Sequence, residues 1–185
     1  MRLPALLLLL ALPALAGPKP KVRFKTSLGT FVVQLEPDAA PKTVENFLGY
    51  VRKGFYRDTL FHRVVPGLII QGGGYTADMK EKAAGPSIPN ESKEAMAKGL
   101  KNRRGTLAMA RTWIPDSAKA QFFINLRDNA AFDIPYEPAG YCVFGRVVQG
   151  LDVVDRIQAV KTGPAAGLRD VPRKPVVILE ASELK

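Results

Sequence analysis

Arg63 and Gln71 lie eight residues apart in a stretch, residues 61–73, that is otherwise mostly apolar and strand-like. Sequence of this kind normally buries one of its faces, where a charged group is costly. A guanidinium held there must therefore either pair with an acid or face a molecule that binds from outside. The second case would place a permanently charged fork of hydrogen-bond donors at a binding surface.

The alternation of a β-strand indicates how this pair would be displayed. Phe61, Arg63 and Val65 would share one side of a strand, and Ile69 and Gln71 would share one side beyond a Pro-Gly turn. The two polar tips would then meet above an apolar floor. Such an arrangement presents charged and amide donors to a molecule that enters an apolar pocket.

Three further segments carry glycines, amides and aromatic residues in a recognisable order. They are residues 105–110 (Gly-Thr-Leu-Ala-Met-Ala), 121–125 (Gln-Phe-Phe-Ile-Asn) and 140–145 (Gly-Tyr-Cys-Val-Phe-Gly). Together with residues 61–73, they resemble the motifs of the cyclophilin family of peptidyl-prolyl cis-trans isomerases, and the resemblance runs from about Val22 to Leu184. The form Met-Ala-Arg-Thr at residues 109–112 resembles the exported bacterial branch of that family.

The resemblance implies an enzyme that accelerates rotation about Xaa-Pro bonds and thereby assists the folding of exported polypeptides. This bond rotates slowly, against a barrier of about 18 to 20 kcal/mol, because the amide is conjugated. No bond is made or broken, so the reaction needs no cofactor. It needs a dry pocket for the proline ring and a donor that favours the twisted amide, in which the nitrogen lone pair is localised.

Site roles follow from the resemblance position by position. Arg63 would be the catalytic donor, and Gln71 would hold the substrate backbone beside it. The substrate-binding positions implied in the same way are Leu68, Ile69, Ala110, Arg111, Thr112, Gln121, Phe123, Phe132 and Tyr141. Ile69 and Phe123 would form walls of the proline pocket, and residues 110–112 would present backbone groups to the residue before proline.

This chain departs from the family pattern in several places. Leu68 stands where relatives usually have phenylalanine, and Arg111 and Thr112 replace the asparagine and alanine of many eukaryotic members. Ala131 takes the place of a tryptophan that binds cyclosporin, and Tyr141 that of a histidine at the pocket edge. We therefore expect weak sensitivity to cyclosporin together with intact isomerisation.

The sequence leaves other roles open for Arg63, for His62 and for the groove as a whole. Arg63 could be a structural ion-pair partner inside the barrel. His62 would point to the opposite face of the strand and is better interpreted as a hydrogen-bonded structural histidine than as a proton shuttle. The whole groove could also serve a peptide-binding or chaperone module without turnover.

Composition excludes some classes of site. Cys142 and His62 are the single cysteine and histidine of the 185 residues, so an intramolecular disulfide is impossible and a zinc site is hard to assemble. The formal net charge of +10 raises the possibility of nucleic-acid binding, but the densest basic stretch, residues 98–104, contains no aromatic residue for stacking. We expect proline-containing polypeptides as partners, no nucleic acid, and a monomer.

The first 16 residues have the three parts of a secretory signal. Met1-Arg2 precedes an apolar run, residues 3–15, and Ala14-Leu15-Ala16 offers small residues for cleavage after Ala16. The alternative, a retained membrane anchor, is disfavoured because the run is shorter than a membrane span and contains two prolines. We expect a signal peptide at residues 1–16 and an isomerase domain at 17–185, located in the periplasm or, alternatively, secreted without membrane insertion.

The remaining pattern is mainly β. Residues 21–26 and 30–35 alternate as a hairpin, and residues 176–179 form a last strand. Helices are predicted at 38–54, with Asp38 as a candidate cap, and at 151–160, with Leu151, Val154 and Ile157 on one apolar face. Residues 75–104 are expected to form a surface excursion without a clear period. We expect a closed eight-stranded antiparallel β-barrel capped by two α-helices.

Overall fold

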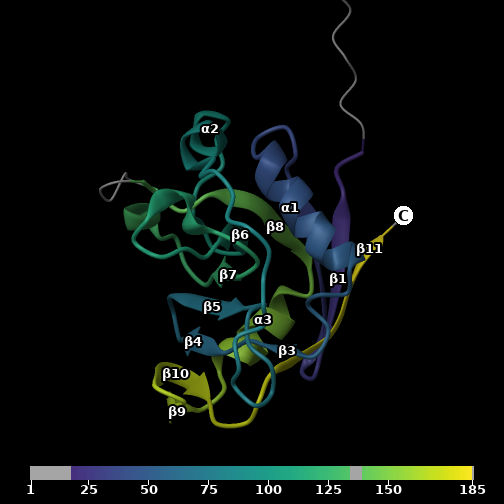
Figure 1. The fold of residues 1–185 in the computed structure, drawn as a ribbon, viewed down its shortest axis with the longest axis vertical. Helices are drawn as coiled ribbons and strands as arrows, with labels where there is room; N and C mark the ends of the chain where they lie inside the picture. The colour runs from purple at the N-terminus through teal and green to yellow at the C-terminus, as the bar shows by residue number, and fades with distance from the viewer. Residues whose placement is uncertain (1–17, 134–138, 185) are drawn as a thin grey trace, which may run out of the picture.

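A computed structural model describes residues 18–133 and 139–184, so the predicted signal peptide lies outside the described residues. Nine strands form one antiparallel sheet in the order β3-β11-β1-β2-β8-β6-β7-β5-β4 (Figure 1). Their bounds are β1 Lys21–Thr26, β2 Gly29–Leu35, β3 Thr59–Leu60, β4 Arg63–Val65, β5 Ile69–Gly72, β6 Thr106–Met109, β7 Phe122–Asn125, β8 Val143–Gln149 and β11 Val177–Leu184. A separate hairpin consists of β9 (Thr162–Ala165) and β10 (Leu168–Pro172).

Hydrogen bonds between β3 and the chain beyond β5 bring the two sides of this sheet together. The Leu60 N–H donates to the Tyr75 carbonyl at 2.8 Å, and the Gly73 N–H donates to the Leu60 carbonyl at 3.2 Å. Thr59 and Thr76 form an antiparallel bridge next to them. Eight strands thus curl into the expected barrel, and β4 adds a ninth strand beside β5 that the sequence did not predict as separate.

Aromatic side chains fill the inside of the barrel. Those that are fully buried are Phe24, Phe31, Phe47, Tyr56, Phe61, Phe122 and Phe144. Their neighbouring ring centroids lie 5.0 to 6.4 Å apart, the spacing of packed aromatic pairs. Because this interior is occupied, a ligand has to bind on the outer wall.

Three α-helices lie among the described residues, one more than predicted. The expected helices are present as α1 (Pro41–Arg52) and α3 (Leu151–Gln158), each shorter than its predicted range. The additional helix, α2 (Ser92–Ala97), lies in the stretch predicted to be irregular, and its six residues are too few to show a helical period. Short 3₁₀ turns occur at Pro115–Ser117 and Ala130–Phe132.

The apolar face of α3 differs from the prediction by one position. Val153, Val154 and Ile157 are buried, whereas Leu151, which was expected on this face, is 37% exposed. Leu151 is the first residue of the helix and follows Gly150, whose φ of +75° turns the chain into the helix. Its side chain therefore lies at the entry of α3, outside the buried stripe.

The predicted cap of α1 is also wrong. The residue before the helix is Ala40, without a side-chain cap, and Asp38 has no capping role. The carboxylate of Glu91 instead accepts hydrogen bonds from the N–H groups of Lys42 and Thr43 at 3.1 and 2.8 Å, and from the Thr43 hydroxyl at 2.8 Å. A residue 48 positions away in the sequence therefore satisfies the free donors at the start of α1.

Candidate active site

Arg63 and Gln71 are paired residues on adjacent antiparallel strands. Strands β4 and β5 place Arg63 opposite Gln71 and Val65 opposite Ile69, so the two polar side chains share one face, as predicted. Arg63 Nη1 donates to Gln71 Oε1 at 3.5 Å. The turn between the strands is closed by the Leu68 N–H, which donates to the Val65 carbonyl at 3.0 Å.

The predicted strand alternation does not hold at Phe61, just before Arg63. Phe61 does not share a side with Arg63: it is fully buried and its ring packs against Phe31 and Phe122 inside the barrel. The reason is that β3 ends at Leu60 and β4 begins at Arg63, so the backbone is not a continuous strand between them.

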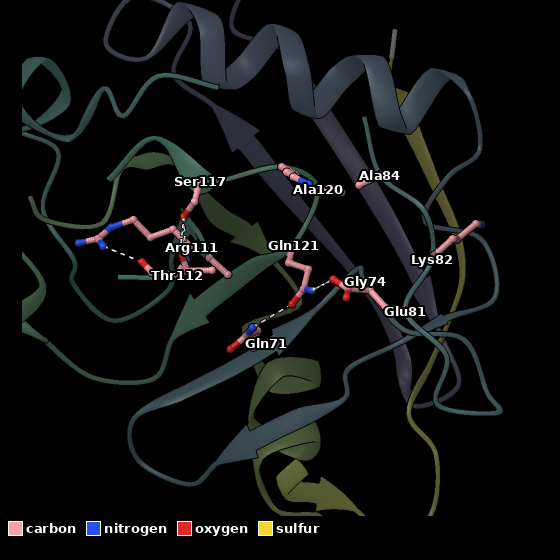
Figure 2. Close-up of a pocket in the computed structure, with 12 residues that line it drawn as sticks. Gln71, Gly74, Glu81, Lys82, Ala84, Arg111, Thr112, Ser117, Ala120 and Gln121 are labelled. Carbon is pink, nitrogen blue, oxygen red and sulfur yellow. Dashed lines mark hydrogen bonds between the residues drawn. The ribbon is translucent and has the colours of Figure 1, made fainter. Parts of the chain in front are cut away.

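Gln71 is held from its other side by a further amide. Gln71 Nε2 donates to Gln121 Oε1 at 3.0 Å, and Gln121 Nε2 donates to Glu81 Oε1 at 3.2 Å (Figure 2). Each amide thus has its oxygen and nitrogen assigned by its neighbours, with Gln71 Oε1 facing Arg63. Glu81 was not among the predicted site residues, because nothing in an irregular loop fixes its distance to the barrel.

An apolar hollow of about 300 Å³ opens beside the Arg63–Gln71 pair. Ile69 and Phe123 form its floor, at 5% and 2% exposure, and Phe132 and Tyr141 stand over Phe123 with ring centroids at 5.8 and 5.4 Å. The hollow is lined by Arg63, Leu68, Ile69, Gln71, Ala110, Arg111, Phe123, Phe132 and Tyr141, so all the predicted positions except Thr112 and Gln121 meet here. A flat, apolar ring the size of a pyrrolidine fits this volume.

Two more hollows extend this one into a groove. One, of about 350 Å³, is lined by Thr112 and Gln121 together with Glu81, Lys82 and Ser117 (Figure 2). The other, of about 380 Å³, is lined by His62, Tyr75 and Arg169 beside Arg63. Gln71 and Arg111 line all three. The site can therefore accept an extended chain that passes over the apolar hollow.

Comparisons with known proteins agree with this geometry. The sequence profile described as "Cyclophilin type peptidyl-prolyl cis-trans isomerase/CLD" matches residues 21–183. The chain belongs to the cyclophilin family. It is an enzyme of the peptidyl-prolyl cis-trans isomerase class, which works without a cofactor.

Relatives with names of this class cover most of the chain. "Peptidyl-prolyl cis-trans isomerase B" of Escherichia coli is 51% identical over 160 residues, covering 85% of this chain and 95% of the relative. "Peptidyl-prolyl cis-trans isomerase A" of Dickeya dadantii is 47% identical, covering 89% and 84%. A crystal structure of a Cryptosporidium parvum cyclophilin in the presence of the dipeptide Ala-Pro has a TM-score of 0.69 at 26% identity, covering 89% of this chain and 99% of that one.

Arg63 is not a buried structural ion pair. Its Nε lies 3.9 Å from Asp170 Oδ2, and both side chains are 43% exposed. The carboxylate belongs to β10, whose hairpin lies beside β4 (Figure 1). A contact this long, between half-exposed groups, leaves the guanidinium free to donate to a bound molecule.

The Arg111 side chain makes contacts that the sequence did not predict. Its guanidinium lies over the Tyr141 ring, 4.7 Å from the centroid, and donates to the carbonyls of Ala139 and Gly140. In the backbone, the N–H groups of Ala110 and Thr112 are already bonded, to the Gln121 carbonyl and the Ser117 hydroxyl. They are therefore not available as donors to a substrate, and Arg111 itself stiffens the wall that Tyr141 forms.

His62 lines the groove beside Arg63 and does not point to the opposite face as predicted. It is 3% exposed, its ring centroid lies 4.5 Å from that of Tyr75, and its Nδ1 has no hydrogen-bond partner among the described residues. Burial lowers the pKa of His62 from 6.5 to about 4, with the charge of Arg63 as a smaller contribution and the Leu60 backbone opposing both. The imidazole is therefore neutral at physiological pH.

The single thiol lies away from this chemistry. Cys142 is 4% exposed, and its Sγ lies 3.6 Å from the Thr43 hydroxyl. Burial raises the pKa of Cys142 to about 12, so the nucleophilic thiolate is not formed near neutral pH. Within the described ranges no group of three His, Cys, Asp or Glu side chains is placed to hold a metal, and no helix is long and apolar enough to span a membrane.

Proposed function

We propose that this isomerase acts on Xaa-Pro bonds of exported polypeptides and assists their folding, with Arg63 as the catalytic donor. One observation carries the proposal: the Arg63 guanidinium stands at the edge of an apolar hollow, oriented by Gln71 rather than by a buried acid. The proline ring occupies the hollow formed by Leu68, Ile69, Phe123, Phe132 and Tyr141. Gln71 and Gln121 hold the flanking backbone.

The guanidinium favours the twisted amide over the planar one. In the planar amide the nitrogen lone pair is delocalised into the carbonyl and accepts hydrogen bonds poorly. When the bond rotates, the lone pair localises on nitrogen and becomes an acceptor for Arg63. An interaction that strengthens only on twisting lowers the barrier, whereas one that is equal in both states does not.

A protease-coupled assay on an Ala-Pro peptide tests this function. Arg63→Ala should lower kcat by about 100-fold, the usual effect of removing one donor to a transition state, and should change peptide affinity much less. Arg57→Ala, an exposed arginine outside the groove, is the matched control and should leave turnover unchanged. Wild-type turnover at the uncatalysed rate, with peptide still bound, would favour the non-catalytic binding module.

The proposed location of the protein, beyond the inner membrane, depends on the first 16 residues. We propose that they are a signal peptide, that residues 17–185 are the mature domain, and that this domain is a periplasmic monomer. Cell fractionation and sequencing of the mature amino terminus test this: Gly17 should be the first residue and the periplasmic fraction should hold the protein. An uncleaved chain in the membrane fraction would contradict the proposal, and recovery from the medium would support the secreted alternative.

A further inference from the structure

The single tryptophan of the chain is exposed to solvent. Trp113 is 80% exposed, and the next residue, Ile114, is 47% exposed. Single apolar residues on a surface are ordinary, so exposure alone assigns no role. Two adjacent large apolar side chains on one loop, however, form a small patch of the kind that often contacts another molecule.

Hydrogen bonds fix the loop that carries this patch. The Thr112 N–H and hydroxyl bond the Ser117 hydroxyl at 2.9 and 2.8 Å, and the Ile114 N–H donates to Thr112 Oγ1 at 3.2 Å. Ser117 Oγ in turn donates to the Ile114 carbonyl at 2.7 Å. Asp116 accepts from the Asn90 N–H at 2.8 Å, which ties the loop to the neighbouring segment. The outward position of Trp113 is therefore built into the loop.

The loop that carries the patch borders the groove. Arg111, Thr112 and Ser117 line the hollow in Figure 2, and Trp113 and Ile114 lie between Thr112 and Ser117 on the same loop. The family resemblance places residues 110–112 beside the residue before proline, and all three line this hollow. A polypeptide that continues from there toward its amino terminus would pass this loop.

We propose that Trp113 and Ile114 form an accessory contact for an apolar side chain that precedes the Xaa-Pro bond in the client polypeptide. The inference rests on the proposed function and adds a preference within it. The indole offers a rigid apolar face at low entropic cost, which suits leucine or aromatic side chains. A polypeptide is the expected occupant because the loop that carries the patch also lines the groove.

The fluorescence of Trp113 can report binding at this patch directly. Intrinsic fluorescence of the mature chain would be followed during titration with Ala-Pro peptides that carry one leucine at successive positions before or after the Ala-Pro pair. Leucine before the pair should shift the Trp113 emission to shorter wavelength and tighten binding about threefold to tenfold over an all-alanine peptide, a normal gain for one apolar contact. Leucine after the pair should do neither.

Variants separate this contact from catalysis. Trp113→Ser and Ile114→Ser should each remove most of the gain from leucine, and both should leave turnover of a short Ala-Pro peptide unchanged. Leu179→Ser, an exposed apolar residue on β11, is the matched control and should retain the gain. Two results would overturn the inference: leucine peptides that saturate the wild type without an emission shift, or leucine peptides that bind both variants as tightly as the wild type. Normal turnover in either case would leave the isomerase function supported. An emission shift with anionic phospholipid vesicles but not with peptides would also overturn the inference, in favour of a membrane contact.

Discussion

Gln71 of β5 lies between Arg63 of β4 and Gln121, the residue before β7: its Oε1 is 3.5 Å from Arg63 Nη1, and its Nε2 is 3.0 Å from Gln121 Oε1. An amide alone could rotate and present its nitrogen to the guanidinium, which would repel it. The bond to Gln121 prevents this rotation, because it requires the Gln71 nitrogen on the far side from Arg63. Gln121 therefore acts on Arg63 through Gln71.

The first prediction concerns Gln121. Gln121→Leu keeps a similar volume but removes the acceptor that fixes the Gln71 amide. We expect kcat/KM on an Ala-Pro peptide to fall about threefold to tenfold, the value of one neutral hydrogen bond. Gln121→Glu retains an acceptor but sets a second carboxylate against Glu81, so it should recover most of the activity when combined with Glu81→Gln. Equal losses in both variants would show that Gln121 contacts the substrate only.

Much of this site could be predicted from the sequence because the residues involved lie on regular strands. The Pro-Gly turn and the strand period together fixed the pairing of Arg63 with Gln71, since a one-residue slip would have moved both side chains into the core. The barrel itself followed from many strands and few helices. Ile69 and Phe123 met in the pocket because their strands, β5 and β7, are neighbours.

The errors occur where regular structure stops. The break between β3 and β4 reversed the expected sides of Phe61 and His62, and no local signal marks that break. Glu91, Glu81 and Asp170 reach their partners from loops or hairpins, over separations of 40 or more residues in the sequence. Such contacts depend on tertiary packing, which the hydrophobic periodicity of a sequence does not predict.

A second prediction follows from the cap that Glu91 provides. Glu91→Ala removes the acceptor of three hydrogen bonds at the start of α1 and leaves buried donors without partners. The free energy of unfolding should fall by about 1 to 3 kcal/mol, as measured by denaturant titration. Asp38→Ala, the cap expected from the sequence, should change it by less than about 0.5 kcal/mol. The reverse order of the two effects would contradict the observed capping.

A third prediction concerns pH and His62. Because its pKa is about 4 in the folded chain and 6.5 in the unfolded chain, only the unfolded chain binds the proton between these values. The free energy of unfolding should therefore decrease as the pH falls from 6.5 to 4, by at most about 3 kcal/mol from this group. Burial raises the pKa of Tyr75, which shares the same hollow, so Tyr75 stays neutral over this range.

His62→Gln provides the comparison for the third prediction. Denaturant titrations of both proteins at several pH values should show a shallower loss of stability in the variant between pH 6.5 and 4. Identical slopes would mean that the histidine is solvated or paired in solution and takes its proton normally. Turnover of the wild type should not follow this titration, because the reaction transfers no proton.

The last prediction uses the position of Ala131. It lies in the 3₁₀ turn Ala130–Phe132, exposed at the edge of the hollow that Phe132 helps to form. The family resemblance places a tryptophan here in members that bind cyclosporin tightly, and a buried tryptophan in an interface commonly contributes 2 kcal/mol or more. The wild type should therefore be inhibited weakly, and Ala131→Trp should tighten inhibition by about 30-fold. An Ala131→Ser control should leave inhibition weak, and tight inhibition of the wild type would show that Phe132 and Tyr141 alone suffice to hold the drug.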